Sequence, residues 1–72
     1  MDRKMVNFIK EQYPPGTRIR LNAMEDPYHP ILPGTEGEVD FVDDGGQIFM
    51  KWNNGRTLPL APREDSFTVL PP

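Results

Sequence analysis

The stretch "QIFMKWNNGRTLPL", residues 47–60, decides the fold of this chain. Apolar and polar side chains alternate in its first half, which is typical of a half-buried β-strand. Asn54-Gly55 then gives a strong signal for a tight hairpin, because both residues tolerate the positive φ angles that such a turn requires. We therefore expect a β-hairpin whose first strand turns three side chains into the core: Ile48, Met50 and Trp52.

The same alternation recurs on both sides of this hairpin, between clear turn signals such as Asp-Asp-Gly-Gly at 43–46. This pattern predicts a mainly β fold, a small five-stranded antiparallel barrel. The expected strands are residues 17–22, 36–42, 47–52, 56–60 and 66–70, with Pro59 favouring an edge or a barrel corner. The side chains expected in the core are Ile19, Leu21, Val39, Phe41, Ile48, Met50, Trp52, Leu58 or Leu60, Phe67 and Val69.

A short helix is expected before the barrel, over residues 2–12. Asp2 can cap this helix, and its apolar residues recur at helical spacing: Met5, Phe8 and Ile9. The Pro14-Pro15 pair then ends it. We therefore divide the single domain into an N-terminal helix, residues 1–13, and a barrel, residues 14–72.

The composition of the chain excludes several classes of site. Its 72 residues include no cysteine, so disulfides, thiolate metal sites and a cysteine nucleophile are excluded. No apolar run is long enough to span a membrane, and the N-terminus has no signal-peptide pattern. We therefore expect a cytoplasmic protein that needs no cofactor and does not act at a membrane.

The charge is acidic and unevenly distributed. The net charge is -3 and the sequence pI is about 4.9, which argues against a general nucleic-acid binder. Residues 21–50 contain no Lys or Arg, and they hold Glu25, Asp26, Glu36, Glu38, Asp40, Asp43 and Asp44. Such an acidic side can be a solvated surface, or it can meet a basic partner or mimic nucleic acid.

Several motifs along residues 14–67 resemble the domain of unknown function 4314 family, in the order of that family. They are "PGTRIRL", "PGTEGEV", "VDD-x-GQI", "KWNNGRTL" and "EDSF". The resemblance implies an SH3-like barrel in a bacterial, plasmid or phage protein. This chain departs from the family pattern at Asn53 and at Arg63-Glu64, which are turn positions, so the expected fold is unaffected.

Phe49 is the most informative candidate binding residue, because alternation places it on the outer face of its strand. Either the N-terminal helix covers it through Phe8 and Ile9, or it forms an exposed apolar contact. Trp52 continues the core face of the same strand. The alternative for Trp52 is a platform on which a base or a proline stacks.

Tyr28 lies in a long loop, residues 22–35, in which prolines recur at every third position. We expect this loop to pack on its own domain, or else to be presented to an aromatic groove of a partner. A set of basic residues could form a nucleic-acid surface: Arg18, Arg20, Lys51 and Arg56. The outward carboxylates of residues 36–40 on a neighbouring strand are alternative partners for these cations.

No pattern in the chain indicates catalysis or metal binding. His29, Ser66 and Asp65 could be drawn as a triad, but any chain with one of each allows that drawing. The run 40–45, with its aspartates and a glycine, fits turn chemistry better than a calcium loop. We therefore expect a non-catalytic binding module for a protein or peptide. The alternatives are a nucleic-acid-associated module similar to KOW domains, and a small phage-type inhibitor that acts by acidic mimicry or ligand sequestration.

Overall fold

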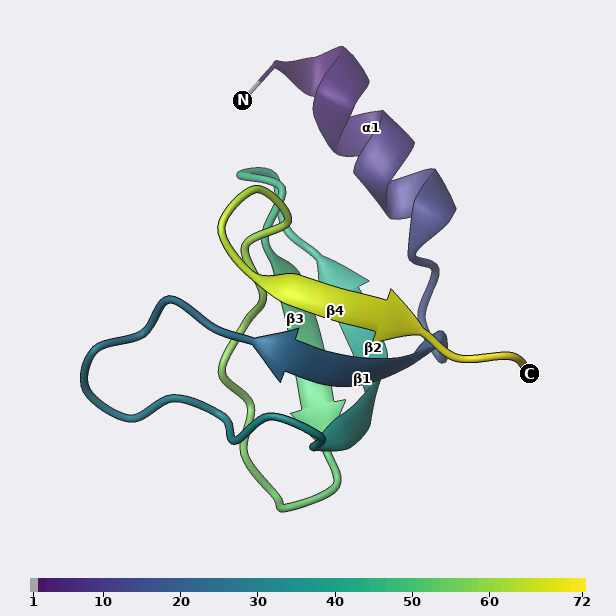
Figure 1. Cartoon of the computed structure of the whole chain (residues 1–72). Helices are drawn as coiled ribbons and strands as arrows, with labels where there is room; N and C mark the ends of the chain where they lie inside the picture. Colours follow the sequence, from purple (N-terminus) through teal and green to yellow (C-terminus); the bar gives the residue numbers. More distant parts are fainter. Residues whose placement is uncertain (1) are drawn as a thin grey trace.

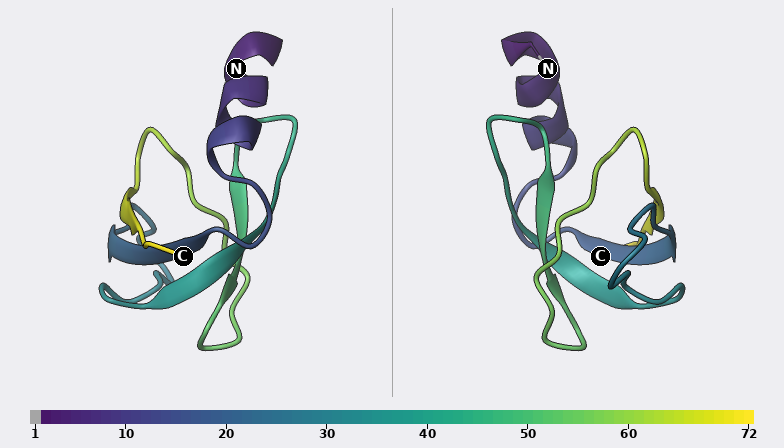
Figure 2. Two further views of the ribbon diagram at one scale, coloured as in Figure 1. Left: turned by 90° about the vertical axis from the view of Figure 1, so that its right-hand side faces the viewer. Right: turned by 90° about the vertical axis from the view of Figure 1, so that its left-hand side faces the viewer.

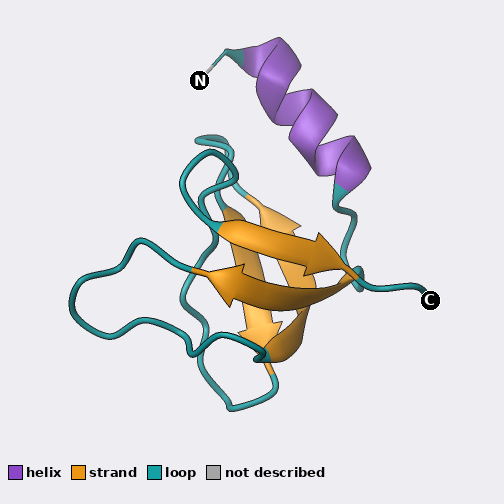
Figure 3. Ribbon diagram, in the orientation of Figure 1, coloured by secondary structure: helices purple, strands orange, loops and turns teal. Residues whose placement is uncertain are grey.

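Residues 2–72, which the computed structural model describes, form one helix followed by a four-stranded antiparallel sheet (Figures 1 and 3). The elements are α1 (Arg3–Gln12), β1 (Arg18–Ala23), β2 (Glu36–Val42), β3 (Ile48–Trp52) and β4 (Ser66–Val69). The strand order across the sheet is β3-β2-β1-β4, so the last strand returns to pair with the first. The fold is therefore mainly β, as predicted, with a short N-terminal helix.

The expected fifth strand, residues 56–60, requires a correction. Its pairing with β3 is limited to one bridge, in which Ile48 and Leu60 exchange main-chain hydrogen bonds of 2.9 and 2.8 Å. Pro59 has no N–H to donate to a sheet ladder, and this limits the pairing on either side of Leu60. The sheet is consequently open, with β3 and β4 at its two edges, rather than closed as a five-stranded barrel.

Aliphatic side chains and Trp52 build the core. Of the predicted core residues, those that are buried are Ile19, Leu21, Val39, Ile48, Met50, Trp52 and Leu60. Among the described residues, four buried hydrophobic side chains lay outside that prediction: Val6, Ile9, Ile31 and Val42. Of the two alternatives Leu58 and Leu60, Leu60 is the buried one, and Leu58 packs against the core from its margin. Two predicted core residues are not buried: Phe67 also packs at the margin, and Val69 lies 48% exposed on the edge strand β4.

Phe41, another predicted core residue, is 47% exposed because β2 contains a β-bulge. Val39 lies opposite Met50, and the next paired residue, Phe41, lies opposite Phe49, so Asp40 is the extra residue on β2. The bulge reverses the alternation beyond this point. Phe41 therefore faces outward, and Val42 turns into the core opposite Ile48.

Helix α1 stands at the end of the sheet where residues 43–46 connect β2 to β3 (Figure 2). Asp2 caps it, since its Oδ1 accepts a hydrogen bond of 2.8 Å from the Met5 N–H. Val6 and Ile9 are the buried side chains of the helix, and Ile9 joins the hydrophobic cluster of the sheet. No helix in the described part of the chain is long and apolar enough to cross a membrane.

Substitution of Trp52 tests the core. The side chain is 3% exposed, and its Nε1 donates a hydrogen bond of 2.8 Å to the Leu58 carbonyl. Trp52→Ala should lower the free energy of unfolding by about 3–5 kcal/mol in a chemical denaturation. Tyr28→Ala, at a position that is 83% exposed, is the control and should change it by less than about 0.5 kcal/mol. Equal free energies of unfolding for the wild type and Trp52→Ala would contradict the buried position of the Trp52 side chain.

Gly37 provides a second test, of the contact between β2 and β3. A Cβ at this position would lie 2.6 Å from the Lys51 carbonyl oxygen and 2.8 Å from the Trp52 Cα, and these backbone atoms cannot move aside. Gly37→Ala should therefore cost about 1–3 kcal/mol of stability. Gly45→Ala is the matched control, because the nearest atom there is Asp43 Oδ1 at 3.4 Å. A melting temperature equally high for both variants would refute the close approach.

Candidate functional site

The outward side of β2 and β3 carries a stacked aromatic pair, Phe41 and Phe49. Their ring centroids lie 4.7 Å apart with an interplanar angle of 2°. The bulge at Asp40 creates this pair, because it turns Phe41 to the same face as Phe49. Phe41 is 47% exposed and Phe49 is half-buried, so the pair offers a flat apolar surface to the solvent.

A groove of about 240 Å³ continues this surface toward the helix. Its lining residues are Lys10, Tyr13, Pro15, Phe41 and Val42. Tyr13 ends α1 as its C-cap, and its ring meets the Phe67 ring edge-on at 5.6 Å, which holds this wall of the groove in place. We call the stacked pair together with these lining residues the aromatic groove.

The sequence left open whether the helix covers Phe49 through Phe8 and Ile9. Ile9 is buried in the core, and Phe8 is 56% exposed. The ring that stacks on Phe49 is that of Phe41, a residue that the sequence placed in the core. One signal pointed to its true position: Phe41 and Val42 are adjacent apolar residues, and a regular strand can bury only one of two neighbours on a given face.

Carboxylates on neighbouring strands engage two of the predicted basic residues, Arg18 and Lys51. Arg18 pairs with Glu36 at 3.5 Å, and Lys51 pairs with Asp40 at 3.8 Å. Arg20 lies on β1 opposite Glu36 of β2. These are the cross-strand pairs expected from alternation. The two pairs place negative charge beside Arg18 and Lys51, which weakens the attraction of this face for a nucleic-acid backbone.

Arg56, the remaining basic candidate, has a structural role. Its guanidinium donates hydrogen bonds to the carbonyl oxygens of His29 at 2.6 Å and Pro30 at 3.2 Å. It thereby fastens the hairpin after β3 to the long loop between β1 and β2. The planar fork of the guanidinium suits two adjacent carbonyl groups, which a lysine cannot reproduce.

Tyr28 protrudes from that loop and is 83% exposed. The loop itself is ordered from within: Asp26 Oδ1 accepts hydrogen bonds from the N–H groups of Tyr28 at 2.8 Å and His29 at 3.3 Å. Ile31 anchors its far side in the core, at 1% exposure. These contacts favour a loop that packs on its own domain over a freely presented peptide.

The acidic residues that sequence reasoning considered for metal or catalysis support turns. Asp43 Oδ1 accepts hydrogen bonds from the N–H groups of Gly45 at 3.0 Å and Gln47 at 2.8 Å. Asp65 accepts from the N–H groups of Glu25 and Ala61, at 2.9 and 2.8 Å. Within residues 2–72, no group of three or more His, Cys, Asp or Glu side chains is placed to hold a metal ion.

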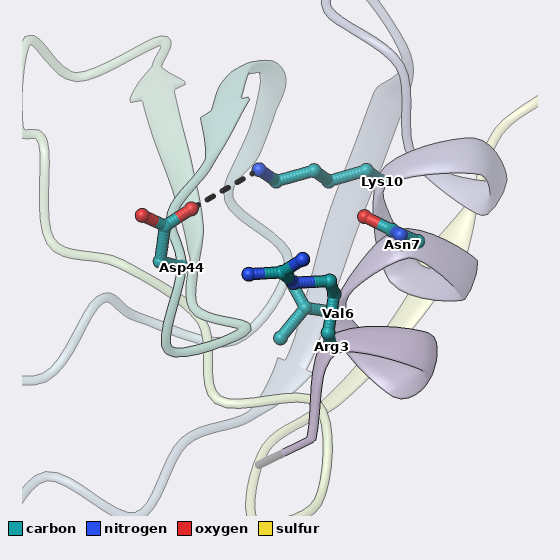
Figure 4. Close-up of a pocket in the computed structure, with 5 residues that line it drawn as sticks. All are labelled: Arg3, Val6, Asn7, Lys10 and Asp44. Carbon is teal, nitrogen blue, oxygen red and sulfur yellow. Dashed lines mark hydrogen bonds and ion pairs between the residues drawn. The ribbon is translucent and has the colours of Figure 1, made fainter.

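A larger groove, of about 350 Å³, separates α1 from the 43–46 hairpin (Figure 4). It is lined by Arg3, Val6, Asn7, Lys10 and Asp44. Lys10 Nζ spans it to Asp44 Oδ1 at 3.3 Å. This ion pair joins the helix to the hairpin, and both signs of charge on the walls give the groove no clear preference for an anion or a cation.

Replacement of Arg56 tests its role as a clamp. Arg56→Lys should lose at least one of the two hydrogen bonds to the loop and lower stability by about 1–2 kcal/mol. Amide exchange in residues 26–31 should become faster, because these bonds hold the loop to the hairpin. Arg63→Lys, at an exposed position, is the matched control and should leave both quantities unchanged. Unaltered exchange in Arg56→Lys would contradict the clamp.

Comparison with known proteins gives one match. No curated protein and no solved structure matches the chain. The family model described as "Domain of unknown function (DUF4314)" matches residues 2–70, which is nearly the whole chain. This extent agrees with the motifs found between residues 14 and 67, and adds α1 to the matched region. The chain therefore belongs to the domain of unknown function 4314 family.

Proposed function

We propose that this domain is a non-catalytic protein-interaction module whose binding surface is the aromatic groove. One observation carries the proposal: a bulge in β2 turns Phe41 outward, where it stacks on Phe49 and remains 47% exposed. Large exposed aromatic side chains on a soluble domain mark surfaces that bind other proteins.

The use of aromatic residues across the molecule supports this proposal. The chain has four Phe residues, and none of them belongs to the buried core. Burying a Phe side chain stabilises a fold by about 1.5–3 kcal/mol, a large amount for a domain with so small a core. At Phe41 the chain lacks this stabilisation, and the exposed ring instead forms an apolar surface beside Phe49.

The setting of the pair also favours binding over mere exposure. The two rings are supported by paired strands and by each other, so little side-chain freedom is lost when a partner covers them. Charged groups surround them, including Lys10 on the helix and the Lys51–Asp40 pair on the strands. An apolar centre with a polar rim is the usual composition of a protein interface.

We also propose that the sheet is an opened SH3-like barrel in a bacterial, plasmid or phage protein. Residues 56–60 run along β3 and touch it at Leu60, while β4 returns to β1. The resulting spatial order, 56–60, β3, β2, β1 and β4, supports that assignment, and the short pairing of Leu60 accounts for the open side. Fold alone does not identify a ligand, so the functional proposal stands on the aromatic groove.

Capture experiments with matched variants test the function. The full chain, immobilised, should retain a protein from a lysate of its source, and the affinity of that purified partner is then measured by calorimetry. Phe41→Ala should weaken binding by about tenfold or more. Its melting temperature should stay close to that of the wild type, because the ring is half exposed.

Phe8→Ala is the control, since Phe8 is an exposed Phe of α1 that does not line the groove. It should bind the partner as the wild type does. Retained binding by Phe41→Ala, or loss in Phe8→Ala alone, would place the interaction surface elsewhere on the domain.

A further inference from the structure

The two edges of the sheet differ in how their main-chain groups are satisfied. At the β3 edge, Ile48 exchanges hydrogen bonds with Leu60, and the Trp52 N–H donates to the Arg56 carbonyl at 3.0 Å. Residues 56–60 therefore cover that edge. At the other edge, β4 pairs with β1 on one side, and within residues 2–72 no strand lies on its other side (Figure 3).

The pairing register identifies which groups of β4 are left open. The Leu70 N–H donates to the Arg18 carbonyl at 2.8 Å, so Leu70 faces β1. Groups alternate along an antiparallel strand, so Thr68 also faces β1, where it lies opposite Arg20. The N–H and C=O groups of Phe67 and Val69 therefore point away from the sheet. No side chain or loop in the described chain bonds to them.

The strand β4 itself has no charge, no proline and, within residues 2–72, no covering loop, so its protection against strand addition is limited to its length of four residues, the register shift at its start and Pro71 after it. Native edges are protected by charges, prolines, bulges or covering loops. The sequence of β4, Ser-Phe-Thr-Val, is uncharged and rich in residues that favour strands. On the outer face, Asn22 Nδ2 donates a hydrogen bond of 3.0 Å to the Thr68 hydroxyl, which joins β4 to β1 through side chains.

We propose that β4 pairs with β4 of a second copy of this chain, antiparallel and around a two-fold axis at Thr68. In this register Phe67 of one copy exchanges main-chain hydrogen bonds with Val69 of the second copy, and the reverse pair forms by symmetry. Both outward residues of each copy are then satisfied. The two sheets join into one continuous sheet across the axis.

The register of the edge favours a second copy as the occupant, because a two-fold axis at Thr68 matches the outward groups of Phe67 with those of Val69. Each chain carries a net charge of -3, which opposes association through most of its surface, but Ser66–Val69 is an uncharged strip. The side chains of Phe67 and Val69 both lie on the core side of the sheet. In the dimer, Phe67 of one copy lies opposite Val69 of the second copy, which makes a favourable cross-strand pair of an aromatic and a β-branched residue. Because the two-fold pairing occupies the β4 edge of both copies, growth through this edge stops at two copies.

Sedimentation of the full chain over about a hundredfold range of concentration tests the proposal. The wild type should convert from monomer to dimer as concentration rises. Val69→Pro removes an outward N–H without removing a bond to β1, so it should weaken the dimer by about tenfold or more. Val69→Thr keeps the N–H and the branched shape, and should dimerise as the wild type does.

Hydrogen exchange provides a readout that needs no variant. In the monomer the amides of Thr68 and Leu70 are protected by β1, while those of Phe67 and Val69 exchange quickly. Protection of the Phe67 and Val69 amides should appear as the dimer forms. The same protection should appear in Phe41→Ala, because Phe41 lies in the aromatic groove and not in the pairing between the two β4 strands. A wild type that stays monomeric with these two amides unprotected overturns the proposal and leaves the edge to a strand of another protein. A dimer in which they stay unprotected overturns it as well.

Discussion

Val39 and Val42 are both buried in the core from β2, although two residues separate them. An evenly alternating strand would place them on opposite faces, so the strand must take in one extra residue. Asp40 is that residue, and the bulge it forms determines which side chains beyond it face the core. The closing contacts of the sheet, between Val42, Ile48 and Leu60, depend on this local change of register.

The same bulge produces the surface on which the proposed function rests. If β2 alternated regularly, Phe41 would face the core and Phe49 would lose its stacking partner. With the bulge, the core side receives the smaller Val42, and the larger ring stacks outside on Phe49. The proposed binding surface and the core packing are therefore two results of one backbone feature, the bulge at Asp40.

The edges of the sheet show a comparable division of roles. The 56–60 segment is too irregular to be a strand, yet its bridge at Leu60 both fills the core and covers the β3 edge. The helix braces the end of the sheet at the 43–46 hairpin, where it is buried through Val6 and Ile9 and pairs Lys10 with Asp44. The short strand β4 is the part of the sheet where main-chain groups remain open, and this asymmetry is the basis of the proposed pairing between copies.

The sequence by itself determined the features that depend on neighbouring residues. Alternation located four strands and the inward position of Trp52, Asn54-Gly55 and Asp43 set the turns, and Asp2 with Pro14 bounded the helix. The tertiary structure decided the rest. Phe41 faces outward because two valines compete for the core, residues 56–60 keep a single bridge because Pro59 cannot donate, and Arg56 binds loop carbonyls that lie 26 and 27 residues away. Each of these outcomes depends on which distant groups meet, and period and propensity do not contain that information.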